Sequence, residues 1–267
     1  MPRYYPERVK RMLGLQKKHN IVRNGDRVLE IGTGWLHWEA LTLRLFYDID
    51  AVLFDVWDNR QLGALKNYVG QLAPMLNGEF GLTDREARRA QTIAAEILKL
   101  DSFEELYRHL GFEYVVESSG SLSQFPSNQF QLVVSGGVLE HVKRDALPHL
   151  ITETYRILKP SGWAVHSIDT ADHLEHYDRT VSPKMYLRFS EQTWRGLFEN
   201  EVQYINRVQR GEWMDLFINN GFESVEEEAH RVDISQLRLA ERYRYMKRSD
   251  LECTVLKVAL RKPTIVT

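Results

Sequence analysis

Short apolar runs alternate with segments of helical periodicity along most of the chain. Strands buried on both faces of a parallel sheet have this apolar character, and the runs occupy residues 27–31, 51–55, 112–116, 130–134 and 164–168. In the stretches between them apolar residues recur at helical spacing, at residues 35–46, 60–74 and 145–158. This alternation predicts an α/β fold with a mostly parallel sheet.

Three further segments lie outside that alternation. Residues 6–20, in an N-terminal segment 1–25, predict a basic amphipathic helix that covers the sheet edge; a lid or a weak anchor to an anionic surface is the second interpretation. Residues 76–111 predict a helical insertion that a minimal strand–helix–strand unit does not need. The chain closes with a helix, two strands and a charged helical connection between the strands, predicted at residues 213–219, 222–228 and 251–261.

Composition narrows the class of protein without deciding it. The 267 residues favour one large domain. The 35 basic and 37 acidic residues give a formal net charge of −2, so no overall charge favours nucleic acid or an anionic membrane. The single cysteine, Cys253, excludes an internal disulfide framework and a multi-cysteine metal site. Because neither a signal-peptide core nor a membrane-length apolar run is found, we expect a cytoplasmic enzyme.

A glycine turn follows the first predicted strand and is the first candidate for chemistry. Gly32 and Gly34 can bend the backbone sharply and approach a ligand closely, and the helix that follows directs free N–H groups into the same space. A dinucleotide-binding fingerprint requires a third glycine where His37 stands. An NAD-dependent oxidoreductase therefore remains only an alternative.

Three motifs in order resemble those of the class I S-adenosylmethionine-dependent methyltransferases. An acidic residue, Glu30, stands two positions before Gly-x-Gly and is similar to motif I, although the usual third glycine of the family falls on Leu36. The Val-Leu-Glu-His-Val sequence at 138–142 is similar to motif II, and Leu-Lys-Pro-Ser-Gly at 158–162 to motif III. The resemblance implies a Rossmann-like, doubly wound, mostly parallel seven-stranded sheet with an antiparallel last strand.

The resemblance also implies S-adenosylmethionine as the cofactor and assigns residues to its parts. The methionine end is expected on the first glycine turn, at Glu30, Gly32, Thr33 and Gly34. The sulfonium side is expected along the loop formed by Gly136, Gly137 and Val138.

Ribose and adenine contacts are expected after the second and third strands. Asp55 ends the second strand 25 residues after Glu30, close to the spacing of an acid that binds ribose hydroxyls, and Asp58 is its alternative. An acidic residue after the third strand commonly contacts adenine in this family. The chain is rich in serine there, so Glu117 or Ser119 is the candidate.

Acceptor chemistry is expected just past the fifth strand, where Asp and His residues are dense. Asp172 beside His173 suggests an imidazole base, with Asp169 orienting it or binding a diol; polar residues on an exposed loop are the alternative. His141 is the competing base, or a residue that braces the motif II loop. No spacing is diagnostic of a metal site, so none is predicted.

The remaining pattern suggests the class of acceptor. Residues 186–210, in a substrate-side helical segment 170–220, combine aromatic and basic residues that suit a sugar or a sugar phosphate. This tail resembles methyltransferases of bacterial polysaccharide and lipopolysaccharide assembly. We therefore predict O-methylation of a saccharide or other polar small molecule, without a nucleic-acid partner. A catalytically silent, methyltransferase-like binding module is the last alternative.

Overall fold

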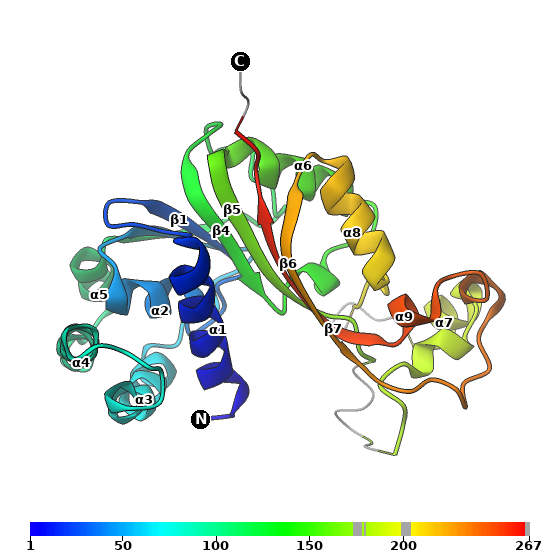
Figure 1. Ribbon diagram of the computed structural model, residues 1–267, viewed down its shortest axis with the longest axis horizontal. Helices are drawn as coiled ribbons and strands as arrows, with labels where there is room; N and C mark the ends of the chain where they lie inside the picture. Colours follow the sequence, from blue (N-terminus) through cyan, green and yellow to red (C-terminus); the bar gives the residue numbers. More distant parts are fainter. Residues whose placement is uncertain (173–177, 179, 199–203, 265–267) are drawn as a thin grey trace. The chain divides into compact units, whose positions relative to one another are not determined.

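One seven-stranded sheet organises the chain, in the order β3-β2-β1-β4-β5-β7-β6. The computed structural model describes residues 1–172, 178, 180–198 and 204–264. The strands are β1 (Arg27–Ile31), β2 (Asp50–Asp55), β3 (Phe112–Val116), β4 (Phe130–Gly136), β5 (Leu158–Asp169), β6 (Glu223–Arg231) and β7 (Cys253–Arg261), and all but β2 and β3 are labelled in Figure 1. β1 pairs in parallel with β2 and β4, β2 pairs in parallel with β3, and β7 runs antiparallel to β6. The predicted seven-stranded sheet with an antiparallel last strand is confirmed.

Nine α-helices are assigned within the described part of the chain. They are α1 (Tyr4–His19), α2 (Trp38–Phe46), α3 (Leu62–Leu72), α4 (Asp84–Ile97), α5 (Phe103–Leu110), α6 (Leu147–Ile157), α7 (Glu191–Leu197), α8 (Arg210–Asn219) and α9 (Arg248–Leu251). By contact, the chain divides into two compact units. The first comprises Met1–Ser135 and Arg156–Trp163, and the second comprises Gly136–Tyr155 and Ala164–Thr267.

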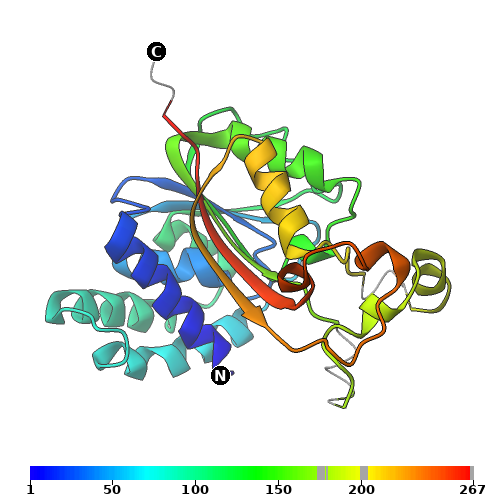
Figure 2. The same cartoon turned by 45° about the vertical axis from the view of Figure 1, so that its right-hand side comes forward.

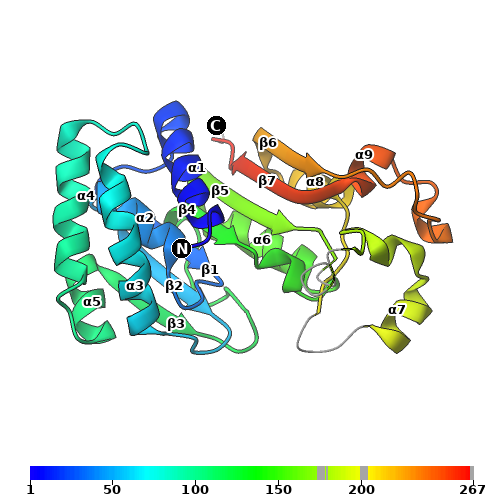
Figure 3. The ribbon, with the colours of Figure 1, turned by 90° about the horizontal axis from the view of Figure 1, so that it is seen from below.

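In the first unit, helices cover strands that are apolar on both faces. Val28, Leu29, Val52 and Leu53 of β1 and β2 are fully buried, as expected for strands inside a parallel sheet. Helix α1 packs on α2, where the indole Nε1 of Trp38 donates a 3.0 Å hydrogen bond to the carbonyl of Tyr5. The predicted insertion contains α4 and α5, which Figure 3 labels, and α4 packs on α3.

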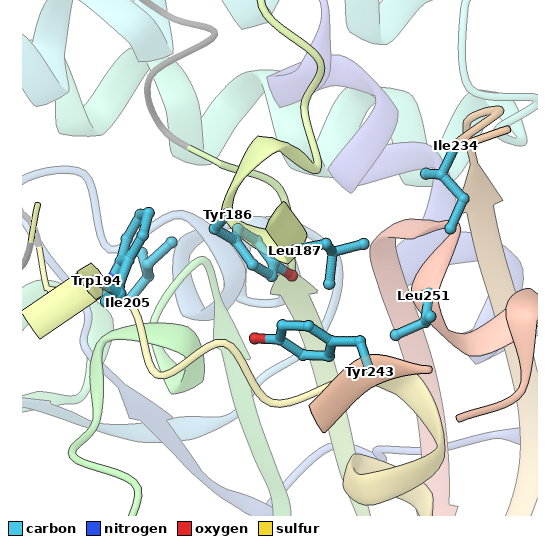
Figure 4. Close-up of a cluster of buried hydrophobic side chains, with 7 residues drawn as sticks. All are labelled: Tyr186, Leu187, Trp194, Ile205, Ile234, Tyr243 and Leu251. Atoms are coloured by element: carbon cyan, nitrogen blue, oxygen red, sulfur yellow. The ribbon is translucent and has the colours of Figure 1, made fainter. Parts of the chain in front are cut away.

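The second unit has a polar edge strand and a separate aromatic core. Helix α8 lies along β6, as the yellow helix beside the orange strand in Figure 2 shows. An apolar cluster, which we call the aromatic cluster, gathers residues from segments far apart in sequence (Figure 4): Tyr186, Leu187, Trp194, Ile205, Ile234, Tyr243 and Leu251.

Two predicted boundaries are wrong for identifiable reasons. Helix α2 begins at Trp38 and not near residue 35, because Gly32, Gly34 and His37 all have positive φ and hold residues 32–37 in a turn. The connection from β6 to β7 is mostly irregular, with only a 3-10 turn at Glu241–Tyr243 and the short α9 in place of the predicted helix. Its apolar side chains enter the aromatic cluster instead of forming one helical face.

Candidate functional site

The glycine turn after β1 is held by the end of β2. The amides of Gly32 and Thr33 both donate to the carbonyl of Phe54, at 2.8 and 3.1 Å, and the amide of Gly34 donates to Oδ2 of Asp55 at 2.9 Å. Gly34 has φ +57°, and a Cβ there would meet no described atom within 4 Å. The turn therefore presents open space beside the carboxylate of Asp55.

Glu30 and Asp55 lie at the same end of the sheet and on the same face. In the parallel register Glu30 is opposite Leu53, and Asp55 is two residues further along β2, so the two side chains point to the same side. Oδ1 of Asp55 accepts the amide of Val56 at 2.8 Å. The sequence prediction that these two carboxylates share one region of the fold depended on this register.

Glu30 is buried beneath the turn, where it binds the start of α2. Its Oε2 accepts a hydrogen bond from the amide of Ala40 at 2.8 Å. This amide lies in the first turn of α2 and has no acceptor within the helix, and the side chain of the N-cap residue, His37, does not provide one. Burial and the neighbouring carboxylate of Glu39 raise the pKa of Glu30 well above its usual range. Arg8 of α1 donates to the carboxylate of Glu39 at 2.6 Å, so a positive charge on the N-terminal helix offsets the negative charge of Glu39.

His37, at the position of the missing glycine, ties the turn to α5. One ring nitrogen, Nδ1, lies 2.9 Å from Oγ1 of Thr33, and the other, Nε2, lies 3.0 Å from the hydroxyl of Tyr107. Burial, together with the charge of Arg60, lowers the pKa of His37 to about 3, so the ring is neutral. Sequence reasoning treated His37 only as a missing glycine and did not detect this role.

The residues predicted for adenine and the alternative ribose acid are placed beside β2. Glu117 donates its amide to the carbonyl of Asp55 at 3.0 Å, and its Oε1 accepts from the amide and hydroxyl of Ser119 at 3.0 and 2.8 Å. Asp58 is engaged by Arg60, with contacts of 2.9 and 2.7 Å, and these hydrogen bonds lower the pKa of Asp58 to about 2. The carboxylate of Asp58 is thus held by Arg60, whereas that of Asp55 is held by the backbone amides of Gly34 and Val56.

In the second unit, the loop after β4 carries the predicted sulfonium-side residues. Gly136 ends β4, and Gly137, with φ +73°, donates its amide to the carbonyl of Ser167 at 2.9 Å. Val138 follows and leads into the 3-10 turn Leu139–His141. A Cβ on Gly137 would lie 3.7 Å from Oε1 of Glu140, so the loop packs closely on this carboxyl group.

A small pocket lies at the ends of β4 and β5 in the second unit. It has room for about one water molecule and is lined by Glu140, Asp169, Thr170, Ala171, Tyr186, Ile205, Asn206, Arg207 and Val208. Glu140 is 3% exposed; its Oε1 accepts the amide of Asp169 at 3.2 Å, while Oε2 has no hydrogen-bond partner in the described part of the chain. Burial first, and the charge of Asp169 second, raise the pKa of Glu140 to about 8.

The predicted acceptor-side residues are separated by the structure. Asp169 lines the pocket, and its Oδ1 accepts the amide of Ala171 at 2.8 Å. Asp172 is buried away from that lining, and its Oδ2 accepts the amide of Tyr186 at 2.9 Å, a structural contact. His173 lies outside the described residues. His141 is exposed, and its Nδ1 bonds the carbonyl of Tyr204 at 2.8 Å, in line with the bracing role.

Four residues outside the predicted catalytic and cofactor-binding sets organise this region. Glu140 stood inside the motif II stretch, and Arg207 stood in the aromatic and basic segment, so both had a weak signal. Asn206 binds the motif II loop through the carbonyls of Leu139 and Val142, at 2.7 and 3.1 Å.

Lys184, the fourth of them, is fully buried. Its Nζ donates to the carbonyls of Thr170 and Cys253, each at 2.8 Å, and to the hydroxyl of Tyr186 at 2.7 Å. Burial lowers the pKa of Lys184 to about 7. These contacts fix the ends of β5 and β7 to the segment that follows Pro183, so Lys184 has a structural role.

Comparisons with known proteins decide the family. The family described as methyltransferase domain matches residues 1–227, most of the chain. The chain belongs to this methyltransferase family. The match confirms the enzyme class predicted from the three motifs and leaves no support for the oxidoreductase alternative. A search of curated proteins gave no match.

Solved structures show the same fold at low sequence identity. A Bacillus halodurans C-125 protein described as a methyltransferase has a TM-score of 0.53 and 14% identity, with 96% of this chain and 99% of that chain covered. Phosphoethanolamine N-methyltransferase 2 of Haemonchus contortus, solved with S-adenosyl-L-methionine, has a TM-score of 0.52 and 15% identity, with 95% and 52% covered. The methyltransferase spans about half the length of this second protein. A [4+2]-cyclase, SpnF, also has the fold, with a TM-score of 0.50, 14% identity and 96% and 81% covered.

The glycine turn of the methyltransferase fits its cofactor, S-adenosylmethionine. Open space faces Gly34, and the carboxylate of Asp55 stands at the end of β2. Apolar side chains that suit the face of a base are exposed at the ends of β2 and β3, namely Val56, Trp57 and Val116. When bound, the cofactor supplies a methyl group on a sulfonium centre.

Among the described residues, no group of three or more His, Cys, Asp or Glu side chains is arranged to hold a metal ion. None of the helices described has the length and apolar character needed to cross a bilayer.

Proposed function

We propose that this methyltransferase methylates a hydroxyl oxygen of a polar small molecule. A saccharide is the acceptor class that we favour, because the C-terminal segment resembles methyltransferases of bacterial polysaccharide and lipopolysaccharide assembly. The observation that carries the proposal is the carboxyl group of Glu140, buried in a pocket with one oxygen unpartnered among the described residues. A hydroxyl acceptor needs a group that removes its proton, whereas a sulfonium leaving group needs no acid.

Glu140 has the properties required of that base. The amide of Asp169 holds Oε1, which leaves Oε2 as the atom that accepts a proton. The raised pKa of about 8 makes the ionised carboxylate more basic than an exposed glutamate. At pH 7 roughly a tenth of the groups are then ionised, so activity rises with pH. Oε2 of Glu140 would take the proton that the acceptor hydroxyl loses on methylation, and the bound cofactor would supply the methyl group.

We propose cofactor contacts for residues of the first unit and, separately, for residues of the second unit. In the first, Glu30, Gly32, Thr33 and Gly34 serve the methionine end through the glycine turn. Asp55 serves the ribose, because its carboxylate lies beside the open space at Gly34.

The other predicted contacts stay proposals with weaker support. Glu117 or Ser119 serves the adenine, since the amide of Glu117 binds the carbonyl of Asp55 and Ser119 binds the carboxylate of Glu117. Gly136, Gly137 and Val138 of the second unit serve the sulfonium side, as the resemblance implies. Asp169 supports Glu140 electrostatically, while His141 and Asp172 hold neighbouring loops. His173 stays a candidate base on sequence grounds.

An acceptor screen tests the proposed function. The enzyme is incubated with methyl-labelled S-adenosylmethionine and a panel of monosaccharides, each paired with its amino-sugar analogue. We expect the label in O-methyl products, and NMR identifies the oxygen that carries it. The amount of S-adenosylhomocysteine released should equal the amount of methylated product. Label found only on nitrogen would contradict the hydroxyl assignment. Cofactor binding without turnover across the panel would favour the catalytically silent binding module.

The base is tested by Glu140→Gln, with Glu79→Gln as a surface control. Loss of a general base lowers kcat by on the order of 100-fold or more. Affinity for S-adenosylhomocysteine should stay within about threefold, because the mutation leaves the glycine turn unchanged. Full activity in Glu140→Gln would exclude the role.

A further inference from the structure

One segment of the second unit concentrates positive charge. Residues 238–248, which we call the basic segment, lie in the connection from β6 to β7 and end at the start of α9 (Figure 1). They include five basic residues and one acidic residue, so their net charge is +4, whereas the whole chain has a formal net charge of −2. Stretches of this length that are rich in Lys and Arg are typical of contacts with polyanions or anionic surfaces.

The basic segment is fixed to the core of its unit. Tyr243 is fully buried in the aromatic cluster, and Met246 packs against the same cluster. The amide of Ala240 donates to the carbonyl of Leu187 at 2.8 Å. The amides of Tyr243 and Met246 donate to the carbonyls three residues before them, at 3.0 and 3.2 Å. Because Tyr243 and Met246 occupy the inner side of this turned backbone, the residues beside them in sequence are exposed.

Three cations of the basic segment have no counter-charge. Arg238, Arg244 and Lys247 are exposed, and none of them makes an ion pair in the described part of the chain. The one hydrogen bond of the Arg244 side chain goes to a backbone carbonyl at 3.4 Å and brings no negative charge. The other two arginines, Arg242 and Arg248, are each paired with a carboxylate. The charge of the first three side chains therefore stays available to a partner.

An exposed tyrosine stands among these cations. Tyr245 follows Arg244 directly and is 91% exposed, more than any other large hydrophobic side chain among the described residues. A tyrosine has an apolar ring and a polar hydroxyl, and it is therefore enriched where a bilayer meets water. Lys and Arg side chains close to a bilayer are attracted by the negative potential of anionic lipids. The two features together match the headgroup region of an anionic bilayer.

Other anionic partners suit the basic segment less well. A nucleic-acid strand is bound in a basic groove with several aromatic side chains on which successive bases stack, whereas Tyr245 is the one exposed aromatic residue of the segment. A stable protein interface has an apolar centre, whereas the exposed side chains here are mostly charged. Binding to a lipid surface requires neither a groove nor an apolar centre.

We propose that the basic segment docks this methyltransferase on an anionic lipid surface. Arg238, Arg244 and Lys247 contact the phosphates of the headgroups, and the ring of Tyr245 lies at headgroup depth. The contact is peripheral and reversible, because a few charges and one ring bind a bilayer weakly. The docking goes beyond the proposed function, since it concerns where the enzyme acts and not which atom it methylates.

Vesicle co-sedimentation tests the docking. Vesicles of phosphatidylcholine alone are compared with vesicles that contain about 30 mol% phosphatidylglycerol. At about 0.1 M salt we expect the protein to partition onto the anionic vesicles about 10-fold or more better than onto the neutral ones, and about 0.5 M salt should release it by screening. Equal partitioning onto both kinds of vesicle, or a preference that salt does not reduce, would overturn the proposal.

Neutralising variants locate the contact. The triple variant Arg238→Gln, Arg244→Gln and Lys247→Gln should lower the partition coefficient on the order of 100-fold, about fivefold for each charge removed. Tyr245→Ala should lower it several-fold, and Tyr245→Trp should bind like the wild type, because Trp also favours the headgroup region. These side chains are exposed, so unchanged thermal unfolding is the check that the variants fold. Wild-type binding by the triple variant would contradict the docking.

A matched control removes the same charge from another exposed basic surface. Arg3→Gln, Lys10→Gln and Lys17→Gln change exposed residues at and along α1 in the first unit, and this variant should bind vesicles like the wild type. A loss of binding in this control as large as that in the triple variant of the basic segment would overturn the proposal. Binding to a uridine oligonucleotide in place of anionic vesicles would also overturn it, in favour of nucleic acid.

The docking and the proposed function fail separately. Methyl transfer to a soluble saccharide is measured without vesicles, so it reports on the proposed function alone. Vesicle binding that is lost in the triple variant, without transfer to any hydroxyl, would leave the docking standing and refute the proposed function. Transfer to a soluble hydroxyl without preference for anionic vesicles would refute the docking alone.

Discussion

The amide of Gly34 donates a 2.9 Å hydrogen bond to Oδ2 of Asp55, which joins the turn after β1 to the end of β2. The two residues are 21 positions apart in sequence, and the parallel register of β1 and β2 brings their strand ends together. The carboxylate is thereby held in place before any ligand arrives. Such preorganisation reduces the entropic cost of binding.

We first predict that Asp55→Ala lowers affinity for S-adenosylhomocysteine by about 10- to 100-fold, as expected for loss of hydrogen bonds to a charged group. The amide of Gly34 also loses its acceptor, so the turn becomes less ordered. Isothermal titration calorimetry measures the effect. Asp48→Ala, which changes an exposed carboxylate of the same unit, should bind normally. Undiminished affinity in Asp55→Ala would contradict the ribose assignment.

Gly34→Ala should separate backbone strain from ligand contact. Alanine at φ +57° costs about 1–2 kcal/mol, and the added methyl group projects into the open space that we assign to the cofactor. Gly81→Ala is the matched control, since Gly81 has φ +62° and equally open surroundings. Urea unfolding should show similar losses in both variants, whereas calorimetry should show weaker cofactor binding only in Gly34→Ala. Equal cofactor affinity in both would remove Gly34 from the site.

The carboxyl group of Glu140 should titrate near pH 8 in the folded enzyme. The ¹³C signal of this carboxyl group, assigned by comparison with Glu140→Gln, reports the midpoint directly. Because the negative charge of Asp169 contributes to the raised pKa, Asp169→Asn should move the midpoint to lower pH. The pH profile of kcat/KM should shift in the same direction. A midpoint below about pH 6 would contradict the buried, proton-binding state of Glu140.

Glu140 should also make the enzyme less stable as pH rises. Between its usual pKa of 4.5 and the folded value of about 8, the unfolded chain has lost the proton and the folded chain keeps it. The free energy of unfolding therefore falls with rising pH in this window, by up to about 1.4 kcal/mol per unit. Glu140→Gln removes that loss, so its stability relative to the wild type should increase from pH 5 to pH 8. Urea unfolding at both pH values measures it; a constant difference would contradict this linkage.

Tyr107→Phe should destabilise the first unit without touching the open space at Gly34. The change leaves the buried Nε2 of His37 without its 3.0 Å partner, at a cost of about 1–3 kcal/mol. Tyr245→Phe, at a side chain that is 91% exposed, should change stability by less than about 0.5 kcal/mol. Thermal unfolding compares the two variants. Equal melting temperatures would show that the His37–Tyr107 contact contributes nothing.

Segments with strong local signals were predictable. The strands β1, β2 and β3 were located because apolar runs bounded by turn residues are local signals, and their boundaries agree to within about a residue. Gly32 and Gly34 were recognisable because only glycine adopts their backbone conformation without strain. The start of α2 was not predictable, since His37 adopts a positive φ only through its tertiary contacts with Thr33 and Tyr107.

The pocket that contains Glu140 was beyond local reasoning. Asp172 looked catalytic beside His173, yet its carboxylate binds the amide of Tyr186, 14 residues away. Glu140 looked like an ordinary motif residue, and its importance comes from burial against Asp169, 29 residues away. Both outcomes depend on which segments pack together.

The sequence by itself determined the family, the order of strands and helices and the glycine turn, because each is encoded in neighbouring residues. Only the tertiary structure decided which polar atoms are buried without a partner in the described part of the chain, among them Oε2 of Glu140 and Nη1 of Arg207. The physical reason is desolvation: the proton affinity of a carboxyl group and the ligand preference of a guanidinium depend on what surrounds them. Those surroundings are assembled from residues far apart in the chain.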